Sequence, residues 1–281
     1  MGDVVELNIK TGKNSRYIRN GLIGIDKAVS FLDEQDNKRF AVAKKIDNAT
    51  RRVTIYDEDF RRLSWFDLPA DGVIDISVSN FHETAGLEIA VAPKYNDTQL
   101  FRVYTMDGDL LYQVAHNYSH NGVSVAALAS PYIAEDSVLV LTSTGVQDFI
   151  PVVRAYENTT EVLYKELDEF ARGGTIAAGD IDADGEDEFI IGSGKGQDTS
   201  LRYYELDGTL KSQFFGYNPG FTGGINAQIL DYDNDGDDDV LISALDGSQP
   251  VRVWNREVKR LANWYPFGED FSGSFFTIIS F

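Results

Sequence analysis

The chain has 281 residues with 25 basic and 45 acidic side chains, a formal net charge of −20 at pH 7, and no cysteine. Disulfides, zinc–thiolate sites and cysteine nucleophiles are therefore excluded. The acidity argues against nucleic-acid binding, which needs clustered basic charge. The sequence has no apolar run of about 18 residues, so we expect no insertion into a membrane.

Repeats of about fifty residues organise the chain after a start, residues 4–17, that has β-strand composition. We place their limits at about 22–71, 72–121, 122–173, 174–223 and 224–272. An apolar run begins at the same place in each repeat, at Phe40, Ile89, Leu139, Phe189 and Val240. An aromatic residue follows each run, at Tyr56, Tyr104, Tyr156, Tyr204 and Trp254. Two separate markers with one period predict a repeat protein.

Each repeat has room for four short strands, which is the size of a β-propeller blade. The final segment, 273–281, has the character of a first strand, and the start of the chain has that of later strands. Sharing one blade between the termini would remove the exposed sheet edges. We therefore predict an all-β fold, a single six-bladed propeller domain over residues 1–281. In it, residues 273–281 plus 1–21 form the closing blade.

Two windows, DIDADGEDE at 180–188 and DYDNDGDDD at 231–239, share the pattern D-x-D-x-D-G-x-x-[DE] before an apolar strand. Alternate carboxylates converge where the backbone turns sharply, and Gly185 and Gly236 allow such a turn. Calcium binds six to eight oxygens. The predicted ligands are therefore Asp180, Asp182, Asp184, Glu188 and the Glu186 carbonyl, then Asp231, Asp233, Asp235, Asp239 and the Asp237 carbonyl.

Two other interpretations of these windows are an EF-hand and a simple acidic turn. An EF-hand needs a glutamate at its twelfth position and flanking helices, whereas Ile191 and Ile242 stand there, next to strand-like sequence. Acidic turns with glycine also simply end hairpins. Two copies with an acid at every ligand position favour the metal site over that simpler interpretation.

The stretches GDIDADGEDEFIIG (179–192) and LDYDNDGDDDVLIS (230–243) resemble the FG-GAP/VCBS repeat family. Those repeats are the calcium-binding blades of integrin α-subunit heads and of many secreted microbial proteins. The resemblance implies two Ca²⁺ ions, although Glu188 stands where the family usually has aspartate. The corresponding windows 31–39, 80–88 and 130–138 lack the acidic pattern, and we expect no calcium there.

No recognisable catalytic motif accompanies these loops, because the three histidines, His82, His116 and His120, lack a further ligand or base at a known spacing. We expect a non-catalytic, calcium-stabilised adhesion or protein-interaction module, extracellular or at the cell surface, with any leader absent from this chain. The alternatives are a calcium-dependent or calcium-stabilised lectin and the accessory propeller of a carbohydrate-active enzyme.

A protein or glycan ligand is expected on the face opposite the acidic loops. That face should gather aromatic residues among amides and charges, as recognition surfaces do. The candidates are Tyr95, Tyr118, Phe149, Tyr217 and Phe221. The alternative is that these are ordinary turn residues.

Overall fold

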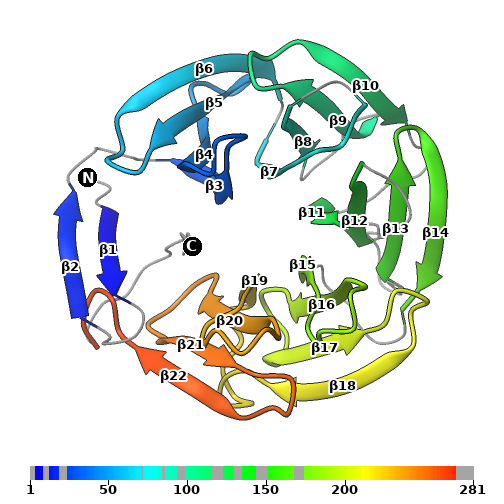
Figure 1. The fold of residues 1–281 in the computed structure, drawn as a ribbon. Coiled ribbons are helices and arrows are strands. Elements are labelled where there is room, and N and C mark those ends of the chain that lie inside the picture. The colour runs from blue at the N-terminus through cyan, green and yellow to red at the C-terminus, as the bar shows by residue number, and fades with distance from the viewer. Residues whose placement is uncertain are drawn as a thin grey trace.

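The computed structural model describes residues 4–8, 13–18, 24–70, 72–83, 86–93, 99–115, 123–129, 135–143, 151–167 and 174–269. Within these ranges the regular structure is entirely β-strand, arranged as a propeller (Figure 1). The described part contains no helix long and apolar enough to cross a lipid bilayer. The predicted all-β propeller is thus confirmed.

Five antiparallel sheets of four strands form the described full blades. The first contains β3 (Ile25–Leu32), β4 (Lys38–Lys45), β5 (Thr50–Asp57) and β6 (Arg62–Pro69). The second contains β7 (Ile74–Ser79), β8 (Glu88–Pro93), β9 (Gln99–Thr105) and β10 (Leu110–Ala115). The third contains β11 (Val123–Leu128), β12 (Ser137–Ser143), β13 (Pro151–Glu157) and β14 (Thr160–Glu166). The fourth contains β15 (Gly174–Gly179), β16 (Glu188–Ser193), β17 (Ser200–Tyr204) and β18 (Leu210–Phe215). The fifth contains β19 (Ile225–Leu230), β20 (Asp239–Ala244), β21 (Val251–Trp254) and β22 (Arg260–Trp264).

A sixth position in the ring holds a two-stranded sheet, β1 (Val4–Asn8) paired with β2 (Lys13–Ile18). It lies between the fifth blade and the first (Figure 1). This arrangement matches the predicted start of the chain as strands of a closing blade. The predicted contribution of residues 273–281 to that blade lies outside the described residues.

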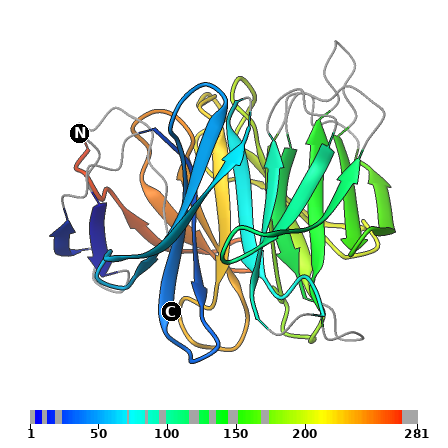
Figure 2. The ribbon, with the colours of Figure 1, turned by 90° about the horizontal axis from the view of Figure 1, so that it is seen from above.

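The burial pattern follows from the position of each strand in its blade. The second strands β8, β16 and β20 are buried at every residue, because each lies inside its sheet and both its faces pack against other blades. The outer strand β18 instead alternates between exposed and half-buried residues. In the side view (Figure 2) the strands run between two opposite ends of the molecule, where the connecting loops lie. Loops that join first strands to second strands share one of these ends.

A buried polar residue stands at the corresponding place in every described innermost strand: Asp26, Asp75, Ser124, Thr175 and Asn226. Ser124 Oγ donates to Asp75 Oδ2 over 2.7 Å, which joins the third blade to the second. Thr175 Oγ1 donates to the Ile225 carbonyl over 2.8 Å, which joins the fourth blade to the fifth. Hydrogen bonds near the axis therefore fix neighbouring blades, including the two that carry acidic loops. The innermost strands surround a cavity of about 210 Å³.

Candidate metal centre

The two acidic loops connect β15 to β16 and β19 to β20, in adjacent blades (Figure 1). In each loop, carboxylate oxygens from the first, third and ninth positions lie within 4.8 Å of one another. These sets are Asp180, Asp182 and Glu188 in the first loop and Asp231, Asp233 and Asp239 in the second. The structure thus brings together six of the predicted side-chain ligands, three in each loop.

Hydrogen bonds to the first aspartate shape each loop. Asp180 accepts the backbone N–H groups of Asp184 and Gly185, both over 3.0 Å. Asp231 accepts those of Asp235 and Gly236 over 3.2 and 3.3 Å. The chain can fold back in this way because both glycines have positive φ, +90° and +96°.

The fourth position of each loop also has positive φ, +57° at Ala183 and +60° at Asn234. Asparagine tolerates this conformation better than alanine, because its short polar side chain can form local hydrogen bonds. The two loops therefore have the same shape, with a less suitable residue at this position in the first.

The last acid of each loop is anchored inside the blade. Glu188 is 1% exposed and accepts the Ile181 N–H over 2.9 Å, and Asp239 is 2% exposed and accepts the Tyr232 N–H over 3.1 Å. Burial, followed by nearby carboxylates, raises the pKa of each group to about 7. A cation bound among these acids would offset the charge that burial disfavours.

The surroundings of one carboxylate oxygen in the first loop indicate whether a cation fits among the three acids. Asp182 Oδ1 is buried and has no hydrogen-bond partner among the described residues. A buried carboxylate oxygen without a partner is unfavourable, and a cation among the three acids would provide one. The donor atoms are all carboxylate oxygens, the ligands that Ca²⁺ prefers. The residues present therefore fit a calcium ion.

The fifth-position acids accept hydrogen bonds from the backbone of their own loops, and their role as metal ligands stays a prediction. Asp184 Oδ1 accepts the Glu186 N–H over 2.9 Å, and Asp235 Oδ1 accepts the Asp237 N–H over 3.1 Å. Neither acid belongs to its group of three converging carboxylates. They stabilise the turn because their side chains are short enough to reach the backbone two residues ahead. The proposed carbonyl ligands at Glu186 and Asp237 remain predictions.

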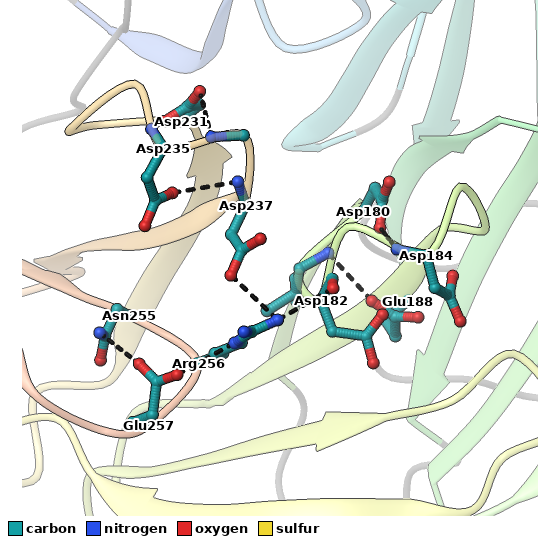
Figure 3. Close-up of polar contacts among 12 residues, drawn as sticks. Asp180, Asp182, Asp184, Glu188, Asp231, Asp235, Asp237, Asn255, Arg256 and Glu257 are labelled. Atoms are coloured by element: carbon teal, nitrogen blue, oxygen red, sulfur yellow. Dashed lines mark hydrogen bonds and ion pairs between the residues drawn. The ribbon is translucent and has the colours of Figure 1, made fainter.

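Several contacts join the two loops into one unit (Figure 3). The Asp238 N–H donates to the Asp180 carbonyl over 3.0 Å. Arg256, from the turn between β21 and β22, donates through Nη1 to the Asp182 carbonyl over 2.9 Å and pairs with Asp237 over 3.0 Å. Sequence reasoning missed Arg256, because it is far along the chain and reaches the loops only through the packing of the two blades.

The corresponding loops of the first two blades are built differently. In the window 31–39, Arg39 at the ninth position pairs with Asp33 at the third over 2.8 Å. In the window 80–88, Glu88 keeps the ninth-position acid and accepts the Phe81 N–H over 2.8 Å, but Asn80 and His82 replace the first two acids. The window 130–138 lies partly outside the described residues.

The prediction that Tyr217 belongs to a contact surface on the opposite face is wrong. This residue is 2% exposed, and its hydroxyl donates to the Pro250 carbonyl over 2.7 Å, inside the fifth blade. The segment after β18 folds back over the core, which its sequence does not reveal. Phe221 is half-buried, and its ring packs edge-on against Tyr217 at 5.5 Å. Tyr95, Tyr118 and Phe149 lie outside the described residues.

No family model matches this chain, and no curated protein matches it. Three solved structures have a similar fold at low sequence identity. A lectin of Aleuria aurantia, a six-bladed propeller with a described mode of fucose recognition, has a TM-score of 0.55 and 13% identity over 85% of this chain and 77% of its own. BBS1N, solved in complex with ARL6DN, has a TM-score of 0.53 and 11% sequence identity, over 90% of this chain and 72% of its own. The V. cholerae biofilm matrix protein Bap1 has a TM-score of 0.50 and 12% sequence identity, over 88% of this chain but 39% of its own.

Proposed function

We propose that this chain is a non-catalytic, calcium-stabilised β-propeller that serves adhesion or protein interaction outside the cell or at its surface. The observation that carries the calcium assignment is the set Asp180, Asp182 and Glu188, whose oxygens lie within 4.8 Å of one another while Asp182 Oδ1 is buried without a partner. The second loop repeats the arrangement. Membership of the FG-GAP/VCBS family is part of this proposal.

A structural role for the ions follows from what the acids already do. Asp180 and Asp231 hold their loops by accepting backbone N–H groups, and Glu188 and Asp239 anchor the loops to the second strands. Bound calcium would supply the positive charge that the crowded carboxylates lack. Because the loops also bond to each other, through Asp238 and Arg256, ion binding would fix the fourth blade against the fifth.

Two classes of ligand agree with a binding module. One similar propeller is in complex with ARL6DN and another recognises fucose. We place a protein ligand first and carry recognition of a sugar as the second candidate. The likeness to the fucose lectin, over 85% of this chain, favours that second candidate.

Two measurements test this proposal. Isothermal titration of chelator-treated protein should give two calcium ions per chain, and Asp182→Asn should reduce the number to one. The absence of heat, or four or more ions, would contradict the calcium assignment. A glycan array and a pull-down, both in calcium, separate the ligand classes. Repeated binding to one sugar class selects the lectin, and a captured protein that binds after purification selects the interaction module.

A further inference from the structure

Tyr203 places a hydroxyl group beside the first acidic loop. The residue lies in β17, opposite Ile190 of β16, and is 7% exposed. Its Oη is buried beside the Glu188 carboxylate but makes no well-formed hydrogen bond with a described residue. A buried hydroxyl that lacks a well-formed hydrogen bond is unfavourable, so this group needs an explanation that apolar packing does not give.

The other described blades show that this position does not require a polar residue. The corresponding residues, fixed by their pairing with the second strand, are Ile55, Val103, Ala155 and Val253. All four are apolar. Among the five described full blades, only the fourth, which carries the first acidic loop, has a hydroxyl at this position. The fifth blade carries the second acidic loop but has Val253 there.

The surroundings of the hydroxyl include the acids of the first loop. Burial raises the pKa of Tyr203, the carboxylates of Glu188 and Asp182 raise it further, and a contact between the hydroxyl and the Glu188 carboxylate acts in the same direction. Asp182 also carries the buried oxygen without a partner. Two polar atoms that lack well-formed hydrogen bonds, Tyr203 Oη and Asp182 Oδ1, thus both come from residues that lie beside Glu188. A cation there would accept lone pairs from both oxygens, while the phenol proton is donated to a neighbouring carboxylate.

We infer that Tyr203 Oη is a further oxygen donor of the first loop, contacting the calcium ion or a water bound to it, and that it makes this site the tighter of the two. This inference rests on the proposed calcium function. The phenol is a neutral oxygen ligand and so agrees with the preference of Ca²⁺ for oxygen. At the second site Val253 offers no such atom, so the two sites should differ in affinity.

The test compares Tyr203→Phe with Tyr204→Phe, which loses the same atom from the next residue, whose ring stacks on Phe189 at 5.2 Å. Calcium is titrated into each variant in an Asp233→Asn background, so that only the first loop binds. Removing a hydrogen bond or ligand contact to a charged group should weaken binding about tenfold in Tyr203→Phe. The Tyr204→Phe variant should bind like the parent.

Thermal unfolding separates a ligand role from a packing role. With chelator, Tyr203→Phe should unfold at the same temperature as the parent or a higher one, because the lost hydroxyl is buried and makes no well-formed hydrogen bond. With calcium it should unfold at a lower temperature. A lower value in both conditions would overturn the inference, as would calcium affinity equal to that of Tyr204→Phe. If the unmodified protein bound no calcium at all, the proposed function itself would fail.

Discussion

The loops at 31–39 and 180–188 occupy the same place in two blades and solve the same electrostatic problem differently. Each has an aspartate at its third position. Asp33 accepts two backbone N–H groups and pairs with Arg39, whereas Asp182 keeps a buried oxygen without a partner. At the ninth position, the loop at 31–39 has a cation, Arg39, whereas the loop at 180–188 has a buried acid, Glu188.

The difference indicates that the acidic charge of this loop can be balanced in two ways. The loop at 31–39 includes its own positive charge, so it needs nothing from solution. The loops at 180–188 and 231–239 instead contain converging acids, and under the proposed function an external cation would balance their charge. Calcium dependence should therefore be a local property of two blades, added to a propeller that the other blades support without it.

Calcium removal should have the largest effect. A ligand that binds only the native state contributes about 2.7 kcal/mol per site at a hundredfold excess over Kd, so two sites contribute about 5 kcal/mol. Denaturant unfolding with calcium and with chelator measures this difference. Asp182→Asn should lose about half of it. Identical unfolding curves in the two conditions would contradict a structural role for the ion.

The pH dependence of the calcium-free protein should be the next largest effect. Glu188 and Asp239 have pKa values of about 7 in the folded chain, above those of the unfolded chain, so the folded state holds more protons between about pH 4 and 7. The contribution of these two groups to stability therefore falls as pH rises through that window. The effect of calcium should be greatest above pH 7 and small near pH 5.

The double variant Glu188→Gln with Asp239→Asn provides the control for that pH effect. It removes both groups that take up protons but keeps oxygens that accept the Ile181 and Tyr232 N–H groups. Unfolding in chelator, followed from pH 5 to 8, should show a smaller fall in stability for this variant. An equal fall would assign the pH dependence to other carboxylates.

The repeat, the blades and the core of each acidic loop could be predicted, because the signals lie close together in the sequence. Runs such as the one at Phe189 mark buried second strands, and nine contiguous residues contain each carboxylate set. Arg256 and Tyr203 could not be predicted, since they reach the loop through blade packing and cross-strand register. The burial of Tyr217 depends on how a loop folds back, which its local sequence does not show.

Arg39→Met tests the loop at 31–39, in which an arginine balances the acidic charge. It removes the built-in cation of the first blade and leaves Asp33 without its ion pair. We expect a loss of stability smaller than that caused by calcium removal, and equal in calcium and in chelator. Unfolding curves in both conditions measure it. Calcium-dependent destabilisation would show that this loop also responds to the ion.

The smallest effect should come from exchanging the fourth-position residues of the two acidic loops. Ala183 has φ of +57° and Asn234 has +60°, a region that asparagine tolerates better than alanine. Ala183→Asn should therefore stabilise the chain by about 0.5 kcal/mol and Asn234→Ala should destabilise it by a similar amount, since neither side chain belongs to the carboxylate sets. Both shifts should persist in chelator, because they come from backbone conformation and not from ion binding. If both variants instead changed stability only in calcium, the fourth position would act through the ion, and the two loops would differ in more than their backbone preference.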